Sequence, residues 1–93
     1  MTRTFEVGRV HTTIATRDGM ITVTYHQTDV VKFNENKIIL NSNGYHTNTT
    51  KTRMNQASHQ FALLFAVYQK DFSWFVTFKG REIPFMDGMI LKR

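Results

Sequence analysis

Hydrophobic residues follow two different periods along this 93-residue chain, and the change of period predicts strands at both ends with one helix between them. Hydrophobic residues occupy every second position from Ile21 to Tyr25, and residues 10–17 alternate less completely. A period of two is typical of a strand with one buried face. Between the two segments, Asp18-Gly19 predicts a type I′ hairpin, because both residues tolerate the positive φ angles of that turn.

Four further segments also have strand patterns. Residues 30–33 and 37–40 form a predicted pair around a turn at residues 34–36, and residues 64–69 and 74–79 alternate around a second turn. The pair Asp87-Gly88 predicts a final hairpin between residues 83–86 and 89–91. Pro84 places the first strand of that hairpin at a sheet edge, because proline has no N–H to give to a neighbouring strand.

The helix is predicted from the middle of the chain. Small and apolar residues recur at helical spacing between Lys51 and Leu63, and a polar connector with several possible caps precedes them, so the helix is expected to begin near Thr50. Together the elements predict an α+β domain spanning residues 1–93. We expect one curved antiparallel sheet of six to seven strands packed on a single central helix, in the order β-β-β-β-α-β-β-β.

Composition narrows the function classes. The chain has no cysteine, which excludes disulfides, thiolate zinc sites and thiol nucleophiles. Its formal net charge is +5, a balance that favours association with nucleic acid or with an acidic protein surface. No acidic residue lies between Glu35 and Asp71, whereas four cations do. This acid-free window contains the predicted helix, so it is the best candidate for an anion-facing surface.

The first candidate site joins the helix start to its connector. Hydroxyls, amides, free main-chain N–H groups and two cations in one place suit a phosphate or a carboxylate. In a duplex groove, the amides of Asn55 and Gln56 are of the type that reads adenine edges. A capped helix with a polar outer face explains the same residues without a ligand. The residues of this candidate are His46, Thr47, Asn48, Thr49, Thr50, Lys51, Arg53, Asn55 and Gln56.

The second candidate site is the aromatic C-terminal half, where Tyr68 and Lys70 are the expected binding residues. Aromatic rings beside cations form stacking platforms for single-stranded nucleic acid. The same rings are also needed for a core: strand alternation puts Trp74 and Phe78 on one face and Phe75 on the other, and only one face can be buried. Tyr68 and Phe72 are expected to be the exposed aromatics.

Catalytic, metal and membrane functions find little support in the residues. No two of the four histidines stand three or four residues apart, and no cysteine adds a ligand, so we expect no metal and no other cofactor. Ser58 and His59 are neighbours on the predicted helix and point about 100° apart, which prevents them from acting as nucleophile and base. We therefore expect a non-enzymatic protein. The longest apolar run is too short to span a bilayer, and a cytoplasmic location is expected.

A resemblance adds to this interpretation. The chain resembles a family of small proteins encoded by tailed bacteriophages, through the pattern Gly-Tyr-x-Thr-x-Thr-Thr-Lys-x-Arg-Met-Asn-Gln that begins at Gly44. The likeness extends to residues 25–26, 57–58, 60–61, 67–70, 74–76 and 84–85, and so covers roughly the last 70 residues. It leaves residues 1–19 outside, so the first hairpin is interpreted as an addition particular to this chain. The resemblance implies a viral origin and supplies no catalytic residue.

Three functional hypotheses follow. The first is a phage-type binding protein that contacts nucleic acid through the basic helix and its connector, in the host cytoplasm. The second is an inhibitor that docks on an acidic surface of a host nucleic-acid-handling or defence complex. The third is a homo-oligomeric virion or accessory protein, suggested by the aromatic content and by the edge strand near Pro84.

Overall fold

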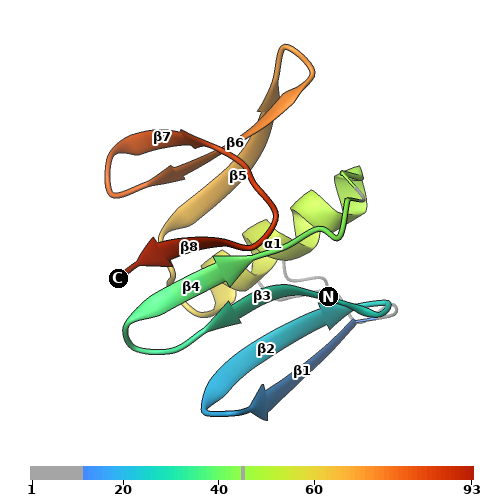
Figure 1. Ribbon diagram of the computed structural model, residues 1–93, viewed down its shortest axis with the longest axis vertical. Helices are drawn as coiled ribbons and strands as arrows, with labels where there is room; N and C mark the ends of the chain where they lie inside the picture. The colour runs from blue at the N-terminus through green and yellow to red at the C-terminus, as the bar shows by residue number, and fades with distance from the viewer. Residues whose placement is uncertain (1–11, 45) are drawn as a thin grey trace, which may run out of the picture.

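The computed structural model describes residues 12–44 and 46–93, which form one helix and eight strands (Figure 1). The predicted α+β class and the predicted order of the elements are confirmed, and an eighth strand ends the chain. The strands divide between two antiparallel sheets. The elements are β1 (Thr12–Arg17), β2 (Met20–Tyr25), β3 (Thr28–Phe33), β4 (Lys37–Leu40), α1 (Asn48–Gln60), β5 (Phe65–Lys70), β6 (Ser73–Phe78), β7 (Arg81–Pro84) and β8 (Met89–Lys92).

The larger sheet has the strand order β1-β2-β3-β4-β8. The hairpin between β1 and β2 is confirmed, with φ angles of 53° at Asp18 and 76° at Gly19, as a type I′ turn requires. The turn between β3 and β4 is fixed by the Asn34 side chain. Its Oδ1 accepts hydrogen bonds from the main-chain N–H groups of Asn36 and Lys37, at 2.8 and 3.0 Å.

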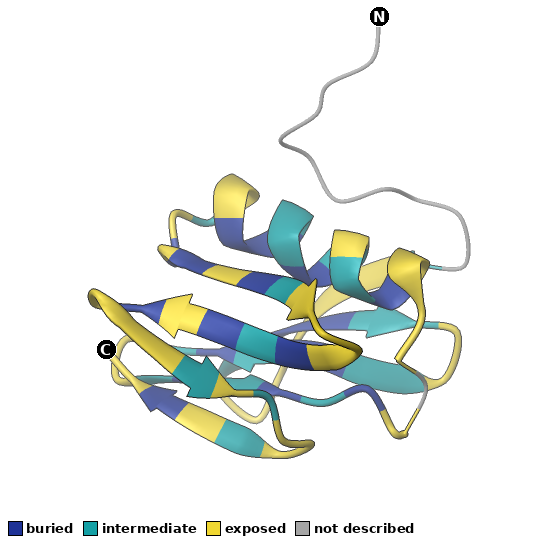
Figure 2. Cartoon of the chain, turned by 90° about the horizontal axis from the view of Figure 1, so that it is seen from above, coloured by how far each residue is buried: buried dark blue, intermediate teal, exposed yellow. Residues whose placement is uncertain are grey.

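The smaller sheet has the order β5-β6-β7, and its first hairpin projects beyond the rest of the molecule (Figure 1). Buried and exposed residues alternate along its strands, as Figure 2 shows. Trp74, Val76 and Phe78 face inward and are buried, whereas Phe75 is half-buried and Thr77 is exposed. The alternation in the sequence left two possible core faces, and the structure selects the one that contains the tryptophan.

The predicted hairpin at Asp87-Gly88 is wrong. β7 pairs with β6 in the smaller sheet, whereas β8 pairs with β4 in the larger one, so residues 85–88 carry the chain from one sheet to the other. The carboxylate of Asp87 accepts hydrogen bonds from the N–H and the hydroxyl of Ser42, at 2.8 and 2.7 Å, and from the N–H of Gly44, at 2.8 Å. Asp87 therefore makes a tertiary contact across 45 residues of sequence.

The helix begins at Asn48, slightly before the predicted start. Thr47 is its N-cap: the side-chain Oγ1 accepts a hydrogen bond from the N–H of Thr50 at 3.1 Å. The helix ends at Gln60, and Ala62 then turns the chain with a φ of 54°. Its buried face includes Met54 and Ala57, and α1 packs against β5, β3 and β2.

Two helix side chains also close the outer edge of β5. Asn55 Nδ2 donates to the carbonyl of Val67 at 2.8 Å, and the N–H of Val67 donates to Asn55 Oδ1 at 2.7 Å. Ser58 makes the equivalent pair with Phe65, at 2.6 and 3.0 Å. An edge strand presents unpaired main-chain groups, so these side chains stand in for a further strand. They also fix the smaller sheet against the helix.

We predict that Asn55→Ala lowers the free energy of unfolding by about 2 to 3 kcal/mol, because two main-chain groups of Val67 lose their partners. Urea denaturation followed by Trp74 fluorescence measures the change. Thr52→Ala is the matched control: Thr52 is exposed on the same helix, and alanine is the better helix former, so stability should stay the same or rise slightly. Equal stability of Asn55→Ala and the wild type would contradict the role given to this amide.

Candidate functional site

The two helix cations of the first candidate site lie on opposite flanks of α1. Lys51 and Arg53 are two positions apart, which separates them by about 200° around a helix. Lys51 Nζ lies 6.0 Å from the centre of the Trp74 ring, on the side of the smaller sheet. Arg53 Cζ lies 5.6 Å from the centre of the Tyr25 ring, on the side of the larger sheet. The structure therefore does not bring these cations together on one face.

On the Lys51 flank, the connector covers Trp74. His46 stacks on the tryptophan, with ring centres 4.7 Å apart and an angle of 23° between the planes, and it meets the edge of Phe85 at 5.5 Å. Trp74 is consequently only 7% exposed, although His46 is itself exposed. His46 and Lys51 thus share one tryptophan beside the β5–β6 hairpin.

On the Arg53 flank, the guanidinium belongs to the packing between α1 and the larger sheet. Its Nε donates to the hydroxyl of Thr12 at 3.0 Å, and its Nη1 donates to Oε1 of Gln56 at 3.2 Å. An arginine held by two hydrogen bonds and an aromatic ring is fixed in orientation. Any ligand of this guanidinium would have to replace contacts that join the helix to β1 and β2.

Two other residues of the first candidate site are held inside the fold. Thr50 is buried beneath its cap, and both amide atoms of Asn55 are bonded to β5. Asn48 is exposed at the helix start, and Gln56 is half-buried beside Arg53. The predicted pair of adenine-reading amides is therefore not presented together, since one member stabilises the smaller sheet.

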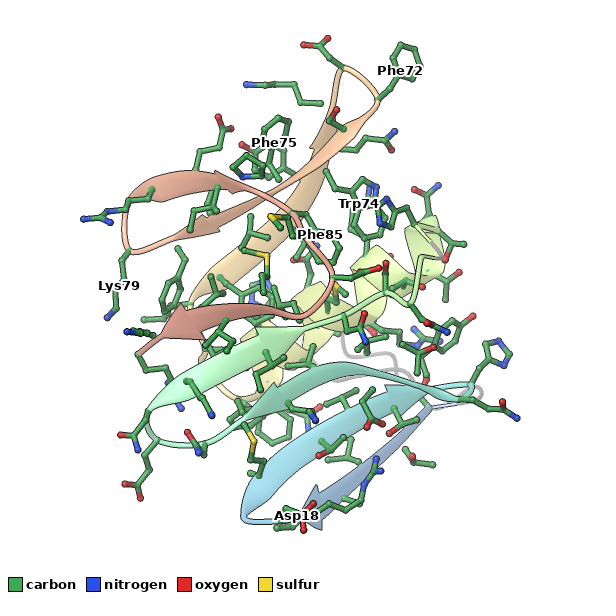
Figure 3. All side chains as sticks on the ribbon, viewed as in Figure 1. Asp18, Phe72, Trp74, Phe75, Lys79 and Phe85 are labelled. Atoms are coloured by element: carbon green, nitrogen blue, oxygen red, sulfur yellow. The ribbon has the colours of Figure 1, made fainter. Side chains whose placement is uncertain are left out.

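The outer face of the smaller sheet carries a row of rings that includes Tyr68. Strand register places Tyr68 opposite Phe75, and Phe75 opposite Pro84, so one ring from each strand lies in the row. Tyr68 and Phe75 are stacked, with ring centres 5.9 Å apart and planes inclined by 28°. Phe75 points to the opposite side of the hairpin from Trp74 (Figure 3).

Lys70 reaches the middle of this row. Its Nζ is 5.5 Å from the centre of the Phe75 ring and 3.7 Å from Oε1 of Glu82. Both charged side chains are substantially exposed, and an ion pair of that kind contributes little stability, about 0 to 1 kcal/mol. Lys70 can therefore exchange Glu82 for an incoming anion at small cost.

Phe72 is the most exposed aromatic of the described residues. It is 98% exposed at the tip of the β5–β6 hairpin and points away from the molecule (Figure 3). Its φ angle is 68°, a left-handed conformation that a bulky residue adopts only at a cost of about 1 to 2 kcal/mol. Two other hairpin turns in which both residues have positive φ angles have glycine at the corresponding position, Gly19 and Gly80. The prediction that Phe72 is exposed is confirmed, and Tyr68 is half-buried.

Two absences concern only the part of the chain that the structure describes. Within residues 12–44 and 46–93, no three potential ligands among histidine, aspartate and glutamate gather where they could hold a metal ion. Within the same residues, no helix has the length and apolar character needed to cross a membrane.

Sequence comparison relates the chain to one protein family. The family model described as Kyanoviridae Gp96 protein matches residues 2–92. The chain belongs to this family. Kyanoviridae are tailed phages, so the predicted resemblance to a tailed-phage protein family is confirmed. The match includes the first hairpin, which corrects its interpretation as an addition particular to this chain. No curated protein and no solved structure matches the chain significantly.

The carboxyl group of Asp87, which holds the segment before the His46 connector, makes the stability of the fold depend on pH. Partial burial raises its pKa, but the hydrogen bonds from Ser42 and Gly44 outweigh that effect, and the nearby His46 adds to them. The pKa of Asp87 in the folded protein therefore lies below its ordinary value. A lowered pKa means that the stabilisation is fully present above the pKa of the unfolded chain, about 3.9, and is lost as the pH falls through the folded value.

We predict that Asp87→Asn lowers the free energy of unfolding at neutral pH by about 1 to 3 kcal/mol, because an amide cannot accept all three hydrogen bonds. The difference from the wild type should narrow as the pH falls from neutral to about pH 2, because protonation of the wild-type carboxylate removes its advantage. Urea unfolding at the two pH values measures both effects. A difference that is the same at both values would show that the charge of Asp87 does not contribute.

Proposed function

We propose that this phage protein is a non-enzymatic binding protein that captures single-stranded nucleic acid, in the host cytoplasm, on the outer face of its smaller sheet. The observation that carries the proposal is the row of Tyr68, Phe75 and Pro84, extended at the hairpin tip by the strained, exposed ring of Phe72. Unpaired bases stack on such rings whatever their sequence, and each stacked base contributes about 1 to 3 kcal/mol.

The dimensions of the surface support this choice. From Phe72 to Lys79 the chain runs along β6 and its two turns, a distance of roughly 23 Å at about 3.3 Å per residue. That length suits a short site of about four nucleotides. Lys70 lies over this face, with its Nζ 5.5 Å from the centre of the Phe75 ring, so a phosphate beside the stacked bases would have a cation within reach.

Of the binding residues predicted in the helix and its connector, two lie beside the smaller sheet. His46 and Lys51 border the same hairpin from its inner side, where they cover Trp74. Lys51 adds a positive charge on that side, and the His46 ring is already stacked on Trp74. Duplex recognition by α1 is less favoured, because Asn55 is bonded to β5 and Arg53 to Thr12 and Gln56.

Binding is tested by fluorescence anisotropy with a labelled oligothymidylate of about 12 nucleotides. We expect Phe72→Gly and Tyr68→Ala each to weaken binding at least fivefold, because each removes a stacking ring. With one phosphate contact, at Lys70, the slope of log affinity against log salt should be about −0.7. Ile14→Thr, an exposed position on β1, is the control and should bind like the wild type. Wild-type affinity in both ring variants would overturn the proposal.

Phe72→Gly also separates function from folding. Glycine adopts the left-handed conformation without steric cost, so this variant should be more stable than the wild type by about 1 kcal/mol, measured by thermal unfolding. Weaker binding in a more stable protein is the expected combination. A loss of stability would show that the Phe72 ring packs within the fold instead of serving a ligand.

A second candidate is an inhibitor that docks on a host protein complex. It is favoured by the pairing of Lys70 with Glu82, which leaves the ring row with little net charge, and by the suitability of an exposed aromatic as an interface anchor. Pull-down from host lysate after nuclease treatment separates the candidates. A host protein that the wild type retains and Phe72→Gly loses, with no affinity of either for oligothymidylate, would favour inhibition.

A further inference from the structure

A cationic groove lies on the other side of the molecule from α1's candidate residues, between the edge strands of the two sheets. Its volume is about 390 Å³, and it is lined by β7, β8 and the β6–β7 turn. Lys79, Arg81 and Lys92 supply three positive charges to its lining, and no lining residue is acidic. Its apolar part includes Ile83 and Ile90, of which Ile90 is 54% exposed.

Among residues 12–44 and 46–93, no strand pairs with the edge of β8 that lies at this groove. The N–H of Arg93 donates to the carbonyl of Asn36 at 2.9 Å, in line with the register that places Lys92 opposite Lys37. Antiparallel strands direct the main-chain groups of alternate residues to opposite sides. Because Arg93 faces β4, Ile90 and Lys92 direct their N–H and C=O groups away from β4, towards the open edge.

In this part of the fold, the edge of β5 is closed and the edge of β7 is interrupted by a proline. The helix side chains Asn55 and Ser58 satisfy the edge of β5. On β7, the N–H of Phe85 donates to the carbonyl of Trp74, so by the same alternation position 84 faces outward, and Pro84 has no N–H to offer there. This confirms the edge position predicted for Pro84. The edge of β8 is therefore the better template for an added strand.

The charges at this edge indicate what would be added. Lys37 and Lys92 are directly opposite in the β4–β8 pair, an arrangement of like charges that destabilises a sheet. Lys79 and Arg81 lie across the groove, so a negatively charged ligand would complement this surface. The accessible aliphatic side chains favour an extended peptide with alternating apolar residues over nucleic acid, since the groove's only ring, Phe78, is buried.

We propose that β8 and this groove bind an acidic, extended segment of a partner protein as an added antiparallel or parallel strand. Main-chain hydrogen bonds to Ile90 and Lys92 would provide affinity, as in other cases of strand addition. Carboxylates of the segment would meet the three cations, and its alternate apolar side chains would cover Ile83 and Ile90. This surface is independent of the ring row on the outer face of the smaller sheet.

The probe is a fluorescein-labelled peptide of about eight residues that alternates glutamate and valine, with a lysine-valine peptide as control. We expect anisotropy to report binding of the acidic peptide alone. The double variant Lys79→Glu/Arg81→Glu should bind it at least tenfold more weakly. Lys92→Pro should also weaken it, because proline removes an N–H that faces the groove and not β4. Hydrogen exchange should show added protection of the amides of Ile90 and Lys92 in the complex.

Further measurements keep the outcomes distinct. Phe72→Gly should bind the acidic peptide like the wild type, even though it is the variant expected to lose oligothymidylate. Urea unfolding shows whether the double charge variant is folded. If Lys92→Pro does not fold, the double charge variant alone tests the proposal. The proposal is overturned if the acidic peptide does not bind, or if the lysine-valine peptide binds equally well. It is also overturned if no peptide binds and the double charge variant has lost affinity for oligothymidylate. The last result would assign the groove to nucleic acid.

Discussion

The fold depends on the passage of the chain from the smaller sheet to the larger one at residues 85–88. At that corner the Asp87 carboxylate holds Ser42 and Gly44 by three hydrogen bonds, and so joins the end of the chain to the segment that follows β4. The same contact holds the connector whose His46 covers Trp74. Without this crossing, β8 would not pair with β4, and the groove between β7 and β8 would not exist.

The two sheets and the helix divide the aromatic residues between packing and exposure. Trp74 and Phe78 face the core with the buried residues of β2, β3 and β4, whereas Tyr68 and Phe75 remain on the outer face. Asn55 satisfies the main-chain groups at the edge of β5, so this sheet ends there without a further strand. A small sheet can thus keep one side in the core and offer the other to a ligand.

Local patterns in the sequence predicted local structure well. The Asp18-Gly19 turn, the single helix and the strand alternation are each set by neighbouring residues, and the structure confirms them. The hairpin predicted at Asp87-Gly88 was wrong. A turn signal specifies that the chain bends, but it does not specify which strand the next segment pairs with. The carboxylate of Asp87 is used 45 residues away, at Ser42.

The candidate site was harder to predict for a similar reason. Lys51 and Arg53 are close in sequence, yet the helix turns them to opposite flanks, where Trp74 and Tyr25 hold them. Lys79 and Lys92 are far apart in sequence and line one groove. A charge count along the chain therefore identified cations but not their neighbours. Phe72 was the exception, since an aromatic at a tight turn is exposed wherever the hairpin lies.

The central claim is that ligand binding belongs to the outer face of the smaller sheet and its hairpin tip. The most direct measurement is an NMR titration of the ¹⁵N-labelled protein with unlabelled oligothymidylate of about eight nucleotides. The account predicts chemical-shift changes concentrated in β5, β6 and the turn that carries Phe72, with the amides of β1 and of the second half of α1 unchanged. Changes confined to residues 46–56, with β5 and β6 unaffected, would contradict it.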